Sequence, residues 1–294
     1  MYIVIGARGF LGSYVVKSIL DTTTEDVLAT ARNVDGFSSN ERIQWVACDI
    51  TKSNDVLSLS EEYLRSHQGN KIIYLAAYHH PDEVEKHPRL AWDTNVTSLS
   101  RFLNIAENVS RFFYPSTDSV YGNSKDGHRF VETDALAPVN RYGRQKCAAE
   151  ALVTAYGYNV VRFPFLIAPS LVPGKKHFYD VIADNLAAGK PMEMFVDSYR
   201  SALDFGQAAE LMVRLMELPE TAPAITNICG DEDLSKYDIG LRIADKLGVS
   251  RELVKPISIT DGNGIFQAKR AASTIMDNSL LKKTLELSEL HLAL

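Results

Sequence analysis

The sequence predicts a doubly wound α/β fold of the Rossmann type with a smaller C-terminal lobe. Three observations carry this prediction. Short β-branched and aromatic runs alternate with longer helical stretches, which is typical of a parallel sheet covered by helices. These runs are nearly continuous in apolar residues, as strands buried on both faces should be. The first run passes directly into a glycine-rich turn and a helix.

The elements follow in order along the chain. We predict strands at 2–5, 27–31, 43–46, 71–76, 111–115 and 159–162, and helices at 10–20, 54–65, roughly 82–108, 141–156, 178–188 and 206–218. A Pro- and Gly-bearing segment at 168–174 indicates a domain edge. We therefore expect a dinucleotide-binding domain at 1–165, rejoined by a segment near 203–230, and a substrate-binding lobe at 166–294.

Composition narrows the function classes. With 294 residues and 46% hydrophobic content the chain can bury a large core. A net charge of -6 disfavours partners such as nucleic acid or an anionic membrane surface and favours small molecules. The three cysteines lie far apart and suggest neither a disulfide framework nor a metal site. Without a signal-like or membrane-spanning run, we expect a cytoplasmic protein.

The glycine-rich turn reads Gly6-Ala-Arg-Gly9-Phe-Leu-Gly12. Glycines let the backbone approach a pyrophosphate, whose charge then meets the positive end of the following helix. The alternative is that these glycines only permit a tight turn. Its position after a buried first strand favours dinucleotide binding.

The end of the second predicted strand indicates which cofactor is used. An acidic residue there binds the ribose hydroxyls of NAD, but this chain has Arg32 instead. Arg32 and Arg8 can hold the 2'-phosphate of NADP, unless both are ordinary solvated arginines. Asp49, after the third strand, is placed to meet the adenine ring or to cap the next helix.

Tyr142 and Lys146 are spaced by one helical turn and share a helix face. A neighbouring ammonium stabilises a phenolate, so we expect Lys146 to lower the pKa of Tyr142 toward neutrality. The spacing alone is common. Its context is the fifth strand, which ends in a hydroxyl cluster that includes Thr117, where an open sheet binds its ligand. A plain Ser- and Asp-rich turn is the alternative.

Together, the glycine turn, the Ser116-Thr117 strand end and the Tyr-x-x-x-Lys pair resemble the extended short-chain dehydrogenase/reductases that modify nucleotide sugars. The resemblance spans about the first 165 residues and includes a structural asparagine, Asn95. It implies that Thr117, Tyr142 and Lys146 are catalytic. It also implies that NADP(H) is bound by Gly6, Arg8, Gly9, Phe10, Leu11, Gly12, Arg32, Asp49, Ile50, Leu75, Ala76, Ala77, Tyr142 and Lys146.

Two departures select a branch of this family. The 4,6-dehydratases carry Thr-Asp-Glu where this chain has Ser119 after Asp118, so the base for water elimination is missing. The 4-epimerases carry an Asn where this chain has Phe165. An aromatic there is similar to the dTDP-4-dehydrorhamnose reductase branch. The C-terminal segment around Arg270 also resembles that branch, although Ala271 replaces its proline.

The same resemblance implies a nucleoside-diphosphate sugar as substrate, contacted by Tyr78, Asp118, Arg200 and Arg270. Both arginines could equally be ordinary surface residues. His79 and His80 lack further ligands at metal-binding spacing, so no metal is expected.

The expected reaction is reduction of a 4-keto sugar, in which Tyr142 donates the proton and Thr117 orients the carbonyl. Three alternatives stay open: an epimerase, a non-catalytic nucleotide-binding subunit, and a substrate that is not a sugar. Relatives of this kind often dimerise through two helices, one of which bears Tyr142, so a homodimer is also expected.

Overall fold

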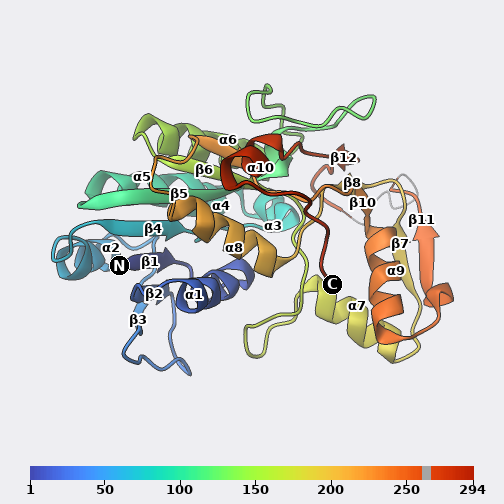
Figure 1. Cartoon of the computed structure of the whole chain (residues 1–294), viewed down its shortest axis with the longest axis horizontal. Helices are drawn as coiled ribbons and strands as arrows, with labels where there is room; N and C mark the ends of the chain where they lie inside the picture. The colour runs from blue at the N-terminus through green and yellow to red at the C-terminus, as the bar shows by residue number, and fades with distance from the viewer. Residues whose placement is uncertain (260–265) are drawn as a thin grey trace.

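The computed structural model, which describes residues 1–259 and 266–294, is built on a seven-stranded sheet in the order β3-β2-β1-β4-β5-β6-β9 (Figure 1). Every neighbouring pair in it is parallel. The predicted Rossmann-type α/β fold is therefore confirmed. The strands are β1 (Tyr2–Ile5), β2 (Val27–Ala31), β3 (Ile43–Ala47), β4 (Asn70–Tyr74), β5 (Val109–Thr117), β6 (Asn159–Phe163) and β9 (Ile225–Asn227).

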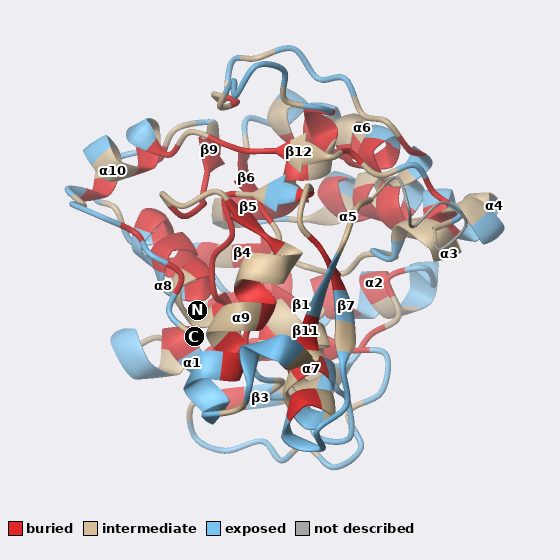
Figure 2. Ribbon diagram, turned by 90° about the vertical axis from the view of Figure 1, so that its right-hand side faces the viewer, coloured by how far each residue is buried: buried red, intermediate tan, exposed pale blue. Residues whose placement is uncertain are grey.

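Both faces of this sheet are buried, and β1 shows how. Its side chains alternate, so Tyr2 and Val4 join one apolar cluster while Ile3 and Ile5 join another. The first cluster includes α1 (Phe10–Thr22) and α8 (Phe205–Met216), and the second includes α2 (Ser53–Leu59), α5 (Ser98–Ile105) and α6 (Arg141–Ala155). Figure 2 shows the resulting buried central strands beneath helices exposed on their outer sides.

Two late segments of the chain lie against this sheet. Helix α8 packs on α1, and β9 adds to the edge at β6. The apolar side chains of α10 (Ser279–Leu285) join the same cluster as α8. The sheet is thus completed by residues that lie far beyond its first six strands in the sequence.

A second group of elements lies beyond the carboxyl ends of the strands, at the right of Figure 1. It contains a separate apolar cluster centred on α7 and α9. Its elements are α7 (Phe178–Ala187), β7 (Met192–Phe195), β8 (Tyr199–Arg200), β10 (Leu234–Ser235), α9 (Lys236–Leu247), η4 (Arg251–Leu253), β11 (Val254–Ile257) and β12 (Ser273–Thr274). Strands β7 and β11 are parallel, and β8 lies between β10 and β12.

The prediction of one continuous helix over 82–108 is wrong. The segment expected as a helix over 82–108 is divided into α3 (Pro81–Lys86), α4 (Pro88–Trp92), η2 (Asp93–Thr97) and α5. The break falls at His87, which leaves the helical region with φ of -125° and ψ of 59°. Pro88 explains it, because a proline disfavours helical geometry in the residue before it. The helix expected at 54–65 is α2 followed by a π-helical turn, η1 (Ser60–Leu64).

Other boundaries differ from the prediction by a few residues at most. Strand β5 is longer than predicted and ends at Thr117, followed by the short turn η3 (Asp118–Val120). Among the described residues, no helix combines the length and apolar character needed to cross a membrane.

Candidate active site

A cavity of about 690 Å³ opens where the carboxyl ends of the central strands meet the C-terminal elements. Strands β1 and β4 are neighbours at the point where the strand order reverses, the position where open α/β sheets bind ligands. The lining includes Gly6, Gly9, Phe10, Leu11, Gly12, Leu75, Ala77, Thr117, Asp118, Tyr142, Lys146, Arg200 and Arg270. These thirteen predicted site residues come from separate parts of the chain, and the fold brings them to one cavity.

The glycine turn is tightly built against the rest of the sheet. A Cβ at Gly6, whose φ is +89°, would lie 2.9 Å from the backbone nitrogen of Ala76. A Cβ at Gly12 would lie 2.6 Å from the carbonyl oxygen of Gly6. Close approach of the chain's own backbone therefore requires both glycines, which the alternative of a tight turn also predicts.

The same turn leaves the start of α1 available to an anion. Its N-cap residue, Gly9, contributes no capping side chain, and the first turn carries no acidic residue. Free backbone N–H groups and the positive end of the helix dipole favour a phosphate here. The described residues of this turn thus fit a dinucleotide pyrophosphate.

Six other predicted site residues do not line the cavity: Arg8, Arg32, Asp49, Ile50, Ala76 and Tyr78. Arg8 lies over the ring of Phe37 at 4.6 Å and donates to the backbone oxygen of Asn33. Arg32 is exposed just after β2. The carboxylate of Asp49 accepts hydrogen bonds from the backbone and hydroxyl of Thr51, so it stabilises the turn before α2 rather than capping the helix directly.

Tyr78 is held by its backbone. Its N–H donates to Oδ1 of Asn95 over 2.7 Å, and its carbonyl accepts from Nδ2 of Asn95 over 3.0 Å. Asn95 also donates to Gln145 of α6 over 2.8 Å. The asparagine suggested by the family resemblance therefore ties the loop after β4 to the helix that carries Tyr142.

Tyr142 and Lys146 lie in the first two turns of α6, which begins after Asn140. The side chain of Asn140 accepts from the N–H of Gly143 over 2.9 Å and so fixes the start of the helix. Thr117, at the end of β5, is close enough to hydrogen-bond Tyr142. The helix and the strand end therefore present the tyrosine and the threonine to the same part of the cavity.

The expected effect of Lys146 on Tyr142 is not found in the structure. Burial and the negative charge of Asp118 raise the pKa of Tyr142, and the hydrogen bond from Thr117 only partly opposes them. The ammonium of Lys146 instead donates to the hydroxyl of Tyr114 over 2.7 Å and to the carbonyl of Pro115 over 2.6 Å. Burial lowers the pKa of Lys146 to about 7, which weakens its electrostatic effect further.

Behind Lys146 lies a buried ion pair that the sequence analysis missed. Glu150 follows Lys146 by one helical turn and pairs with Arg162 of β6 over 2.7 Å. It also accepts a short hydrogen bond from Ser116, which precedes Thr117. A recurrent four-residue spacing of Tyr142, Lys146 and Glu150 was visible in the sequence and could have indicated one shared helix face.

The two predicted substrate arginines are already engaged. Nε of Arg200 lies 3.3 Å from Asp118, and its other nitrogens donate to the carbonyls of Tyr199, Ala271 and Ala272. Arg270 pairs with Asp82 over 3.0 Å. Asp118 in turn accepts from Thr117 over 3.0 Å.

Several cavity residues were not predicted, and His177, Phe178 and Lys236 are the main ones. His177 caps α7, and its ring contacts Phe10 of the glycine turn at 4.9 Å. Burial lowers the pKa of His177 to about 4, so it is neutral at physiological pH. No local motif points to these residues. Among the described residues, no group of three or more His, Cys, Asp or Glu side chains is arranged to hold a metal.

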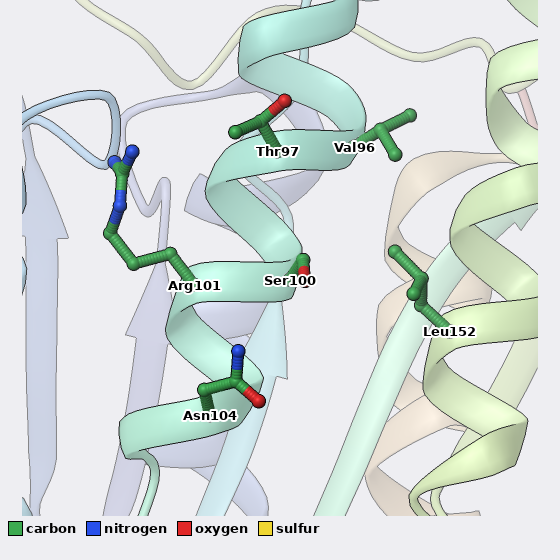
Figure 3. Close-up of a pocket in the computed structure, with 6 residues that line it drawn as sticks. All are labelled: Val96, Thr97, Ser100, Arg101, Asn104 and Leu152. Atoms are coloured by element: carbon green, nitrogen blue, oxygen red, sulfur yellow. The ribbon is translucent and has the colours of Figure 1, made fainter.

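A smaller hollow of about 450 Å³ lies away from this site (Figure 3). It is formed between α5 and α6 by Val96, Thr97, Ser100, Arg101, Asn104 and Leu152. None of the predicted site residues belongs to it, so it does not compete with the large cavity as a candidate active site.

Comparison with curated proteins gives relatives of two activities. The chain is 27% identical over 282 residues to a dTDP-glucose 4,6-dehydratase of Salmonella typhimurium, covering 83% of this chain and 76% of the relative. It is 25% identical over 300 residues to a dTDP-4-dehydrorhamnose reductase of Aggregatibacter actinomycetemcomitans, covering 94% and 90% respectively.

Solved structures of the same fold bind nicotinamide cofactors. A dTDP-4-dehydrorhamnose reductase of Bacillus anthracis in complex with NADP superposes with a TM-score of 0.78 at 20% identity, covering 98% of this chain and 94% of that one. A UDP-glucuronic acid 4-epimerase of Bacillus cereus, solved with NAD, superposes with a TM-score of 0.81, also at 20% identity and with the same coverage.

A family profile described as the RmlD substrate-binding domain matches residues 1–292. The match covers nearly the whole chain, including the C-terminal elements, where the sequence resemblance was weakest. It confirms the resemblance to extended short-chain dehydrogenase/reductases and to the dTDP-4-dehydrorhamnose reductase branch. This chain belongs to the RmlD substrate-binding domain family.

Proposed function

We propose that this protein is an NADP(H)-dependent oxidoreductase that reduces the 4-keto group of a nucleotide-linked sugar, with Tyr142 as proton donor. One observation carries the proposal: a single cavity contains the glycine turn together with Thr117, Tyr142 and Lys146. When bound, the nicotinamide cofactor supplies the hydride for the reduction. The names of the relatives, which are sugar-nucleotide reductases and dehydratases, support the substrate class.

The state of Tyr142 suits a proton donor. Because burial and Asp118 raise its pKa, the phenol keeps its proton at neutral pH and can give it to a developing alkoxide. Thr117, already within hydrogen-bonding reach of Tyr142, orients the carbonyl oxygen toward the phenol. Lys146, which donates to Tyr114 and Pro115 in this structure, would hold the cofactor ribose when the cofactor is bound.

We infer a preference for NADP over NAD from the end of β2. Arg32 is exposed there, and among the described residues its guanidinium has no hydrogen-bond acceptor. Arg8 lies in the glycine turn, stacked on Phe37. Two guanidinium groups at the adenosine end of the site suit a 2'-phosphate, whereas an NAD-specific site needs an acidic residue.

We propose a corresponding division of the chain. Residues 1–165 and the segment near 203–230 bind the cofactor, and the rest of 166–294 binds the sugar nucleotide. The packing of α8 on α1 and the pairing of β9 with β6 support the return of the second segment. The separate apolar cluster of α7 and α9 supports an independent lobe.

We further propose that the protein forms a homodimer through the outer faces of α5 and α6. Trp92, at the end of α4, is 47% exposed, and Tyr156, which follows α6, is 44% exposed. The hollow in Figure 3 lies between α5 and α6. Light scattering tests this directly: Trp92→Glu should convert a dimer to a monomer, whereas a monomeric wild-type protein contradicts it.

The central experiment follows the loss of NADPH absorbance with a panel of nucleotide-linked 4-keto sugars, with NADH as the control cofactor. Oxidation that depends on one sugar supports a reductase and identifies its substrate. Tyr142→Phe should abolish turnover while NADPH affinity stays nearly unchanged, because only the proton donor is removed. A wild-type protein that binds NADPH but oxidises it with no sugar in the panel would overturn the proposal.

A further inference from the structure

The cations that line the cavity differ in whether a carboxylate pairs with them. Among the described residues, four lysine or arginine side chains line it: Lys146, Arg200, Lys236 and Arg270. The ammonium of Lys146 already donates to the hydroxyl of Tyr114 and the carbonyl of Pro115. Arg200 is paired with Asp118 at 3.3 Å, and Arg270 with Asp82 at 3.0 Å. The carboxylates therefore neutralise both arginines before any ligand arrives.

Lys236 has a different environment. It is the first residue of α9, and among the described residues no carboxylate lies within ion-pairing distance of its ammonium. The ammonium instead lies over two aromatic rings, 4.2 Å from the centre of Phe165 and 4.5 Å from that of Phe178. Both rings also line the cavity.

The two rings hold the ammonium in place but replace its hydration only in part. Cation–π contacts stabilise a desolvated ammonium by less than the cost of removing its water. Burial and the neighbouring charges of Arg200 and Arg270 lower the pKa of Lys236 to about 8. At neutral pH Lys236 thus stays largely charged and, among the described residues, has no carboxylate partner, so it gains from an incoming anion.

We propose that Lys236 is the anion anchor of this cavity and binds the diphosphate of the nucleotide-linked substrate. This inference rests on the proposed function, and it assigns the phosphate contact to a lysine instead of the two arginines expected from the sequence. The charged groups that act on Lys236 are Arg200 and Arg270, from the C-terminal part of the chain, and Asp118, just after β5, whereas the cofactor turn lies between β1 and α1.

The chemistry of each cation fits this division of roles. An ammonium is a compact point charge with three donors that can turn toward whichever phosphate oxygen arrives. The guanidinium of Arg200 has fixed geometry, is already ion-paired with Asp118 and donates to the backbone before β12. Arg200 is therefore a positioning residue that holds Asp118 and the β12 segment, and Lys236 is the group free to bind.

The test uses binding, which does not depend on finding the true sugar. Titration calorimetry of the full-length protein saturated with NADP would measure the binding affinities of dTDP and UDP. Thymidine and uridine would serve as phosphate-free probes. Lys236→Met keeps the length and apolar stem of the side chain but removes its charge. For whichever diphosphate the wild type binds, we expect Lys236→Met to lower the affinity by roughly 10- to 100-fold, the range for a charge-assisted hydrogen bond.

Two further variants make the result specific. Lys236→Arg should retain most of the affinity, because it restores a cation above Phe165 and Phe178. Lys255→Met removes an exposed lysine of β11 outside the cavity and should leave affinity unchanged. Nucleoside affinity should be the same in wild type and Lys236→Met.

The outcomes separate the two proposals. If wild type binds a diphosphate and Lys236→Met binds it equally well, Lys236 is not the anchor, and the proposed function is unaffected. If Lys236→Met weakens nucleoside and diphosphate alike, the residue shapes the cavity and does not bind phosphate, which also overturns the inference. If wild type binds neither diphosphate, the nucleotide-sugar assignment fails and this inference fails with it.

Discussion

Removing either partner of the buried Arg162–Glu150 pair should destabilise the protein severely. The two side chains are 2% and 5% exposed, and Nη2 of Arg162 lies 2.7 Å from Glu150. Arg162 also donates to the hydroxyl of Tyr121 over 2.7 Å and to the carbonyl of Glu132 over 3.1 Å. Glu150 accepts from Ser116 as well. Both charges are therefore buried, and each is the other's ion-pair partner.

The magnitude follows from this burial. Arg162→Met leaves the carboxylate of Glu150 buried with only the Ser116 hydroxyl as a donor, and Glu150→Met leaves an uncompensated guanidinium. Either change should cost about 3–5 kcal/mol of unfolding free energy, a large part of the 5–15 kcal/mol typical of folded proteins. The double variant replaces the pair by apolar side chains and should recover most of that loss.

Urea denaturation of the four proteins measures these energies as a double-mutant cycle. With a slope of about 3 kcal/mol per molar urea, each single variant should unfold at a midpoint roughly 1–2 M lower than wild type. Arg251→Met is a matched control: Arg251 pairs with Asp245 over 2.6 Å, but their side chains are 65% and 46% exposed. It should shift the midpoint little, because solvent screens exposed ion pairs.

Two results would refute this reasoning. Single variants of Arg162 and Glu150 that unfold like the Arg251→Met control would show that burial does not strengthen the pair. A double variant whose loss equals or exceeds the sum of the single losses would show that the side chains act independently. The same variants also test function. Glu150 lies on the helix that carries Tyr142 and accepts a hydrogen bond from Ser116, which precedes Thr117 at the end of β5.

Three other predictions address the cofactor site. Arg32→Asp should shift the ratio of NADP to NAD affinity toward NAD by roughly 10- to 100-fold through loss of a charge-assisted contact, while Arg89→Asp, another exposed arginine, should leave that ratio unchanged. Gly12→Ala should abolish NADPH binding in a fluorescence titration, because the new Cβ would lie 2.6 Å from the carbonyl oxygen of Gly6; near-normal affinity would mean that the turn relaxes without cost. The pKa of Lys146 is about 7 in the folded protein and near 10.5 in the unfolded chain. Burial of its charge therefore lowers the free energy of unfolding by the full amount below pH 7, and this loss disappears as the pH rises to 10.5. Wild type should therefore gain stability over Lys146→Met by about 1.4 kcal/mol per pH unit between pH 7 and 9.5, and parallel pH profiles of the two urea midpoints would contradict this.

The parts of the molecule that depend on local chemistry were accessible from the sequence. The strands of the central sheet are short and apolar throughout, and the glycine turn follows the first of them, so both the fold class and the start of the cofactor site could be predicted. The pairing of Tyr142 with Lys146 on one helix face depends only on the four-residue spacing. The glycines and the asparagine Asn95 likewise have local patterns that a sequence reader can recognise.

The electrostatic state of the same residues depended on distant partners. Whether Lys146 acts on Tyr142 is decided by Tyr114, which lies 32 positions earlier and accepts its hydrogen bond. Arg200 was expected to be free for a ligand, but Asp118 neutralises it from the end of another strand. No helical or strand period relates such residues, so their charges and pKa shifts could not be predicted.

The sequence by itself therefore determined the α/β class, the glycine turn and the shared helix face of Tyr142 and Lys146, because each is specified within one element or one turn. Only the tertiary structure decided which cation is available to a ligand. Among the described residues, Lys236 has no carboxylate partner, because Phe165 and Phe178, from two other segments, lie beneath its ammonium while Asp118 and Asp82 pair with Arg200 and Arg270. Burial and charge balance arise from contacts between segments far apart in the chain, and these contacts exist only once the chain is folded.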